Sequence, residues 1–225
     1  MNDELKVTRN GQILEVTLDR PKANAIDAAT STAMGQVFSD FRDDNDLRVA
    51  ILTGGGDRFF SAGWDLKAAA EGESYDSDYG VGGFGGINEL FDLNKPVIVA
   101  MNGHAIGGGF ELALAADIII AADHVEMWQP EIFAGVIGDS GCFRLPRMIP
   151  MNIAKELLLT GRRMGTEEAL RWGIINAAVP VDQLMVAARE MAETMIAAAP
   201  LALAATKETI RLTQSVGIEE CYAMM

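Results

Sequence analysis

NGHAIGGGFELALAAD, residues 102–117, is the stretch that decides the fold of this chain. The preceding residues 95–101, KPVIVAM, form a short apolar run with β-branched residues, which is typical of a strand buried on both faces. Residues 110–116 are rich in Ala and Leu, which favour a buried helix. Three glycines, Gly107 to Gly109, lie at the junction, where they permit a sharp turn and the close approach of another molecule to the main chain. We therefore expect a strand, a glycine turn and a helix in direct succession.

Glu111 is the one acid in the first turn of that expected helix. The first amides of a helix have no intrahelical acceptor, so they can donate to a negative group. Free amides beside a semi-buried acid are the components of an oxyanion site next to a proton-transfer group. A second interpretation stays open at this point: the glycines serve helix packing and Glu111 interacts with the helix dipole. The stretch matches neither a P-loop nor a dinucleotide-binding motif.

Two other segments offer the same kinds of groups. SAGW, residues 61–64, is a second tight turn before an expected helix, so it supplies further free amides. QPE, residues 129–131, is a turn that carries a second isolated acid, Glu131. Residues 72–86 are rich in Gly, Ser, Asp and Tyr, which predicts a surface loop of a length often found in lids.

The remaining elements follow from apolar patterns. Runs at residues 13–18, 49–53 and 118–122 predict strands, and the strand–helix–strand order at 13–53 predicts a right-handed crossover. Asp27 and Thr30 are N-cap candidates for a helix that runs to about Arg42. Helices are also expected at residues 66–70, 87–93, 183–199 and 201–212, and Thr166 is expected to cap a helix that ends at Trp172. We find no repeat and no linker that separates two domains.

Composition limits the possible functions. A chain of 225 residues that is 49% hydrophobic can bury one large α/β core with a helical appendage. A net charge of −14 argues against nucleic acid as a partner. Two cysteines without a paired motif, and no evident signal peptide or membrane span, predict a cytoplasmic protein. Two histidines and no cysteine cluster leave a metal site unsupported.

Five motifs together resemble the crotonase (enoyl-CoA hydratase/isomerase) family, and they occur in the order typical of that family. They are RPKANAID at 20–27, FFSAGWDLK at 59–67, KPVIVAMNGHAIGGGFELALAAD at 95–117, QPE at 129–131 and TGRRMGTEEALRWGI at 160–174. Within the family, three of these segments look most like members that hydrate crotonobetainyl-CoA, an intermediate of carnitine metabolism. The resemblance implies an α/β fold with a repeated ββα superhelix at residues 1–180. It also implies a C-terminal helical region at 181–225, apparently shorter than in the family.

The resemblance also implies an activity and a site. It implies a hydro-lyase that adds or removes water across the α,β double bond of an acyl-CoA thioester, as in fatty acid metabolism. No cofactor is expected, because CoA is part of the substrate, and a homotrimer or homohexamer is expected. The implied residues are Glu111 and Glu131 for catalysis, the Trp64 and Gly108 amides for the oxyanion hole, and Lys22, Ala23, Ala25, Ala62, Asp65 and Leu66 for CoA binding. We expect Glu131 to protonate the α carbon and Glu111 to orient the water.

Some features depart from the family pattern and leave alternatives. Trp128, and GDSGC at 138–142, replace the residues usual beside the acyl pocket. Trp64, Phe84 and Trp128 are candidates to surround a trimethylammonium group, although each also suits core packing. Residues 138–141, GDSG, resemble the nucleophile segment of serine proteases, so a hydrolase that uses Ser140 is one alternative. A catalytically impaired CoA-binding protein is the other.

Overall fold

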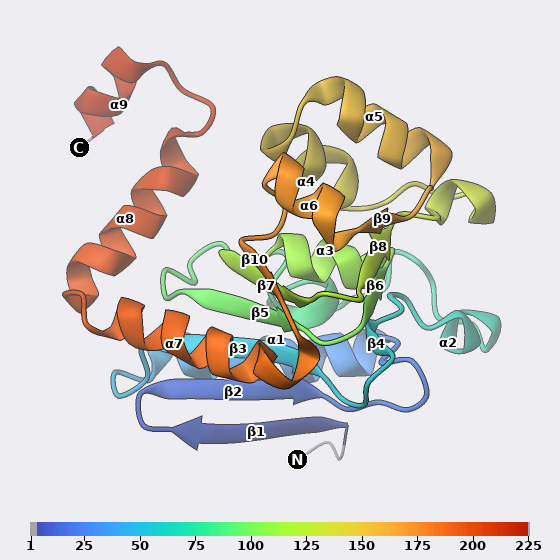
Figure 1. The fold of residues 1–225 in the computed structure, drawn as a ribbon, viewed down its shortest axis with the longest axis horizontal. Coiled ribbons are helices and arrows are strands. Elements are labelled where there is room, and N and C mark those ends of the chain that lie inside the picture. Colours follow the sequence, from blue (N-terminus) through green and yellow to red (C-terminus); the bar gives the residue numbers. More distant parts are fainter. Residues whose placement is uncertain (1–3, 225) are drawn as a thin grey trace.

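A computed structural model describes residues 4–224 of the chain. Its main layer is a six-stranded sheet, in which β1 is antiparallel to β2 and every other neighbouring pair is parallel (Figure 1). In spatial order the strands are β1 (Leu5–Asn10), β2 (Ile13–Leu18), β3 (Val49–Gly54), β5 (Val97–Met101), β7 (Ile118–Ala122) and β10 (Ala177–Val179). The predicted crossover is confirmed, because β2 and β3 are parallel neighbours joined by α1 (Ala28–Asp43).

A second, four-stranded sheet lies beside the first. Its strands are β4 (Phe59–Ser61), β6 (His104–Ile106), β8 (Glu126–Trp128) and β9 (Met164–Gly165), and only β9 is antiparallel to its neighbour. The chain alternates between the sheets and then turns into a helix: β3–β4–α2 (Leu66–Ala70), β5–β6–α3 (Gly108–Leu114) and β7–β8–η2 (Glu131–Ala134). The predicted repeated ββα core is therefore confirmed.

The core sits between the large sheet and the helices around it. Strands β3 and β5 are buried over nearly their whole length, as expected for parallel strands covered on both faces. On α1, Met34, Phe38 and Phe41 face this core, and burying each contributes roughly 1.5–3 kcal/mol. The Asp27 carboxylate accepts a hydrogen bond from the Thr30 amide, so the predicted N-cap at Asp27 is confirmed.

The C-terminal third of the described chain is mostly helical. The elements there are α4 (Gly141–Met148), α5 (Met151–Thr160), α6 (Thr166–Trp172), η3 (Val181–Gln183), α7 (Leu184–Ile196), α8 (Pro200–Thr213) and α9 (Ile218–Met224). Helix α7 packs on β3, β5 and β7 through buried Leu184, Ala188 and Ala192. Helices α8 and α9 instead lead away from the body of the molecule (Figure 1). Helix α8 buries no residue. No helix among residues 4–224 is long and apolar enough to cross a membrane.

Two predictions about helices were wrong. Residues 87–93 form turns, preceded by the short 3-10 helix η1 (Phe84–Gly86), because Gly85 and Gly86 adopt positive φ angles that do not continue into a helix. Gly165, and not Thr166, is the N-cap of α6. The Thr166 hydroxyl instead donates to the Asp123 carbonyl at 2.8 Å, which ties α6 to the turn after β7.

Candidate active site

Glu111 lies in the first turn of α3, where the glycine junction and the apolar helix place it inside the protein. Its side chain is 4% exposed, and its Oε1 accepts a hydrogen bond from the Gly141 amide at 2.8 Å. Burial raises the pKa of Glu111 to about 7, and the negative charges of Glu131 and Asp139 raise it further against the lowering effect of the Gly141 amide. This acid can therefore exchange a proton near neutral pH.

Glu131 is the first residue of η2, on the other side of the glycine turn. A Cβ placed on Gly107 would lie 2.5 Å from Glu131 Oε1, so the carboxylate rests directly against that turn. Its Oε2 is buried and lacks a hydrogen-bond partner in the described chain, and burial raises its pKa. The structure thus brings the two predicted acids together around one stretch of backbone, with Oε2 of Glu131 free to bind a ligand or water.

The two candidate oxyanion amides belong to turns that touch. Gly63 has a φ of +83°, and a Cβ there would lie 2.8 Å from the Gly108 nitrogen, so only glycine permits this approach. Ile26 and Asp65 make the hydrogen bonds of the bridge beside Trp64, which leaves the Trp64 amide unused. Neither the Trp64 nor the Gly108 amide donates a hydrogen bond within residues 4–224.

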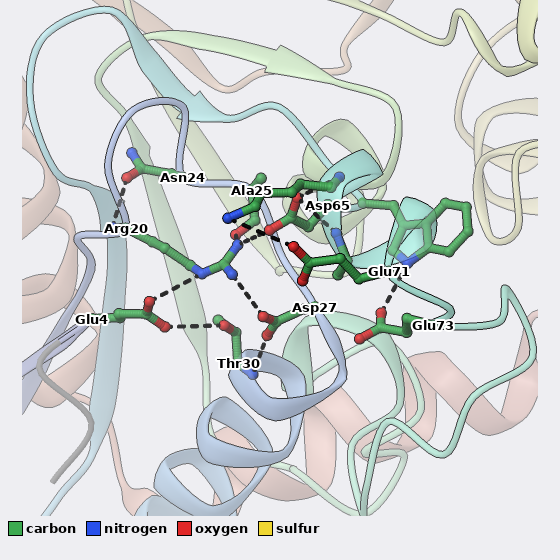
Figure 2. Close-up of polar contacts among 12 residues, drawn as sticks. Glu4, Arg20, Asn24, Ala25, Asp27, Thr30, Asp65, Glu71 and Glu73 are labelled. Carbon is green, nitrogen blue, oxygen red and sulfur yellow. Dashed lines mark hydrogen bonds and ion pairs between the residues drawn. The ribbon is translucent and has the colours of Figure 1, made fainter.

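An ion-pair cluster around Arg20 holds the segment that carries Trp64 (Figure 2). The Arg20 guanidinium donates to the Ala25 carbonyl at 2.9 Å, to Asp27 at 2.7 Å and to Asp65 at 2.5 Å, and pairs with Glu4. It therefore connects the turn at residues 20–27, the start of α1 and the residue next to Trp64. Burial by itself raises the pKa of Asp65. The hydrogen bonds from Arg20 and from the Lys67 amide and the positive charge of Arg20 act against burial, and on balance the pKa of Asp65 is lowered.

The implied CoA-binding residues lie on two adjoining turns. The Ala23 carbonyl accepts from the Ala62 amide at 2.9 Å, which joins the turns directly. Lys22 is exposed and forms no ion pair in the described chain, and Leu66 is 72% exposed. The Asp65 carboxylate differs, because it caps α2 through the Lys67 amide and pairs with Arg20, so it is occupied by the protein itself.

Sequence analysis missed several residues at this site. Gln129 is 3% exposed, its two amide atoms lack partners in the described chain, and a Cβ on Gly141 would lie 2.5 Å from its nitrogen. Arg144 donates to the Asn88 carbonyl at 2.9 Å and lies close enough to Glu111 for their charges to interact. The negative charge of Glu111 also raises the pKa of Tyr75. In the sequence, one feature pointed to Gln129: it stands two residues before Glu131, a candidate catalytic acid.

The serine hydrolase alternative lacks a base. Ser140 is buried and donates to Asn88 at 3.1 Å. His104 Nδ1 accepts from the Glu126 amide at 3.0 Å, and His124 lies beside Asp123, so both histidines are engaged elsewhere. The described residues also contain no group of His, Cys, Asp and Glu that could hold a metal ion.

Known proteins of one family resemble this chain in sequence and in structure. The family model for enoyl-CoA hydratase/isomerase matches residues 8–222. Curated relatives from Salmonella arizonae and Salmonella typhi, each called carnitinyl-CoA dehydratase, are 60% identical over 99% of this chain and 85% of their own length. The enoyl-CoA hydratase of Mycobacterium tuberculosis H37Rv superposes with a TM-score of 0.91 at 39% identity, covering 98% of this chain and 86% of that one. The carnitinyl-CoA hydratase of Mycobacterium avium gives a TM-score of 0.87 at 36% identity, over 99% and 88%. The chain belongs to the enoyl-CoA hydratase/isomerase family.

Proposed function

We propose that this protein is a hydro-lyase that hydrates 2-enoyl-CoA thioesters and dehydrates the corresponding 3-hydroxyacyl-CoA. The observation that carries the proposal is the pairing of Glu111 and Glu131 around a glycine turn that also presents a free amide. Glu111 is buried and Glu131 is half-buried, burial raises the pKa of each, and the charge of Glu131 raises the pKa of Glu111 further. Such a pair suits transfer of protons to and from a water molecule near neutral pH.

The chemistry follows from where charge develops. When water adds to the β carbon, electrons move through the double bond and place negative charge on the thioester oxygen. The Trp64 and Gly108 amides would donate to that oxygen, and loss of one such donor in other enzymes costs roughly 2.7–4 kcal/mol. Glu111, in its ionised form, orients the water and accepts its proton. Glu131 delivers a proton to the α carbon, and the reverse order dehydrates the 3-hydroxy product.

The CoA moiety would lie along the two adjoining turns. Exposed Lys22 can meet a CoA phosphate, while Ala23, Ala25 and Ala62 offer main-chain surface without bulky side chains. Asp65 would contribute through its main chain and its bond to Arg20, since its carboxylate is already paired. The relatives named above make crotonobetainyl-CoA and carnitinyl-CoA the substrate pair that we propose. No cofactor beyond the CoA of the substrate enters this scheme.

We also infer that the chain works as a homotrimer or homohexamer in the cytoplasm. Helix α8 buries no residue, and its Leu201 is 84% exposed. A groove of about 630 Å³ separates α8 from the body and is lined by apolar residues such as Leu90, Phe143 and Met195. Apolar surface of this extent supports contact with another subunit. Light scattering at micromolar concentration tests it, and a monomer of 24.1 kDa would contradict it.

The function is tested by following the absorbance of the conjugated thioester with crotonyl-CoA and crotonobetainyl-CoA. Glu111→Gln and Glu131→Gln should each reduce kcat by at least ~100-fold while acyl-CoA binding persists. The double variant should lose far less than the two losses combined, because both groups act as one unit in the same hydration step. Ser140→Ala should stay within a few-fold of the unaltered protein. An inactive Ser140→Ala with active glutamine variants would refute the proposal, and binding without any turnover would support an impaired CoA-binding protein.

A further inference from the structure

Tyr75 extends from the loop at residues 71–83 over the candidate site. Its ring meets the Trp64 ring edge to face at 5.9 Å and 85°, next to the proposed oxyanion amide. Its hydroxyl donates to the Ile137 carbonyl at 3.4 Å, so the loop reaches the segment that leads into α4. The ring is 43% exposed and therefore retains surface for a ligand.

Two further aromatic rings extend the aromatic surface of Trp64 and Tyr75 toward the reacting centre. Tyr79 and Phe84 pack edge to face at 5.5 Å and 80°, and the Tyr79 hydroxyl donates to the Tyr75 carbonyl at 3.2 Å. A Cβ on Gly108 would lie 2.6 Å from Phe84 Cε1, so Phe84 touches the glycine whose amide is the second oxyanion donor. The edge-to-face pair of Tyr79 and Phe84 therefore lies next to the proposed oxyanion amide of Gly108.

The charges that face these rings are almost all negative. Burial raises the pKa of Tyr75 to about 12, and the charges of Asp139, Glu111 and Glu131 add to that effect. Asp139 also acts on Tyr79, and it is exposed and forms no ion pair in the described chain. Arg144 is the cation whose charge interacts with Asp139, but it is half-buried and its guanidinium donates to the Asn88 carbonyl.

We propose that Tyr75, Tyr79, Phe84 and Asp139 form a subsite for a quaternary ammonium group on the acyl chain. This inference rests on the proposed function, because it names the acyl group that the same site selects. A trimethylammonium cation has no N–H to donate, so it is recognised by aromatic faces and by opposite charge. In crotonobetainyl-CoA this cation is one carbon away from the β carbon, beside which Glu111 and Glu131 must lie.

The structure removes one aromatic candidate from this role. Trp128 lies on β8, where the Arg163 guanidinium sits 4.5 Å from its ring centre and His104 meets its edge. A protein cation already covers that ring. Trp64 contributes to the aromatic surface only through its ring contact with Tyr75. Its indole nitrogen is already used, because it donates to Glu73 at 3.0 Å.

The test uses two saturated thioesters that hydration cannot consume: γ-trimethylammoniobutyryl-CoA and its carbon isostere, in which a tert-butyl group replaces the trimethylammonium. An ordinary apolar pocket would prefer the tert-butyl group, because the cation loses more hydration on burial. A cation subsite reverses the order. Calorimetry on the unaltered protein should therefore give a Kd that is about tenfold lower for the cationic thioester.

Two variants should reduce that Kd ratio by about three- to tenfold each: Asp139→Asn, which removes the charge, and Tyr75→Leu, which removes the ring. Tyr75→Phe keeps the ring and should keep the ratio. Asp78→Asn is the matched control, because Asp78 is an exposed acid on the same loop as Tyr75. Within the described chain its carboxylate only accepts a hydrogen bond from the Gly80 amide.

Each result decides the matter. An unaltered protein that prefers the tert-butyl thioester, that binds neither thioester, or whose cation preference survives both Asp139→Asn and Tyr75→Leu overturns the subsite. Cation preference without turnover of crotonyl-CoA or crotonobetainyl-CoA supports the subsite and refutes the proposed hydro-lyase. Turnover without cation preference does the reverse.

Discussion

Replacing Glu111 by glutamine should stabilise the protein at alkaline pH while it removes activity. Glu111 is 4% exposed, and its pKa is raised from 4.5 to about 7, mainly by burial. The folded state therefore holds the proton more tightly than the unfolded chain does. The favourable contribution of the protonated acid is complete below pH 4.5 and is lost as the pH rises through about 7. At about 1.4 kcal/mol per pKa unit, this loss amounts to ~3 kcal/mol.

Glutamine has almost the same shape and does not ionise. Its side-chain oxygen can still accept from the Gly141 amide, which is 2.8 Å from Glu111 Oε1. The free energy of unfolding, measured in urea at fixed protein concentration, should therefore be ~2–3 kcal/mol higher for Glu111→Gln than for the unaltered protein at about pH 8.5. At about pH 5 the difference should fall below ~1 kcal/mol.

Glu190→Gln is the control, because Glu190 is an exposed acid on α7. It should change stability by less than ~0.5 kcal/mol at both pH values. If Glu111→Gln gains no more stability at about pH 8.5 than at about pH 5, the Glu111 carboxylate is hydrated or paired in the folded protein. That result would refute the inference that burial disfavours the ionised form of Glu111 in the folded protein.

Three other predictions concern the same site. Hydration should slow at least ~tenfold as the pH falls from about 7 to 5.5, because protonated Glu111 cannot accept the proton of water; a rate that does not fall over this range would contradict this. Gly63→Ala should reduce kcat by ~100-fold or more, since its Cβ would lie 2.8 Å from the oxyanion amide, whereas Gly56→Ala, with a similar φ of +76° and open space around it, should mainly reduce stability. Arg20→Ala should destabilise the fold by ~3 kcal/mol, and Arg42→Ala, whose partners are exposed, by under ~1 kcal/mol, as urea unfolding would measure. Equal losses for the two arginines would show that the Arg20 cluster is not structural.

Much of the fold was predictable because its signals are local. The Asp27 cap and the apolar spacing on α1 lie within one helix, and the apolar runs of β3 and β5 mark strands buried on both faces. Strand β1 escaped prediction because five of its six residues are exposed, so it lacks the alternating pattern of a half-buried strand. Strands β4 and β6 are three residues long, which is too short for any periodicity to show.

The site was predictable only as separate residues. Glu111 and Glu131 attract attention because each is an isolated acid beside an apolar segment. Their raised pKa values depend on contacts between distant positions, such as the Gly141 amide, which is 30 residues from Glu111 in the sequence. Arg20 and Asp65 are 45 residues apart in the sequence, and no pattern of neighbouring residues predicts that they pair. Tyr75 lies in a loop whose composition indicates only surface exposure, so its place beside the glutamates needed the three-dimensional structure.

The proposed ammonium subsite and the proposed acid pair act on one another through charge. In the free protein, burial and, to a smaller extent, the charges of Glu131 and Asp139 raise the pKa of Glu111 to about 7, so this base is partly protonated, and to that extent inactive, near neutral pH. A trimethylammonium group beside Asp139 would offset those negative charges and lower the pKa of Glu111 in the complex. The charge that selects the substrate would then also ionise the base that the hydration step uses. Because kcat/KM reports the free enzyme and kcat the complex, the apparent pKa of kcat for crotonobetainyl-CoA should lie below that of kcat/KM, and the two should coincide for crotonyl-CoA. Coincident values for both thioesters would show that the cation binds too far from Glu111 to affect its proton.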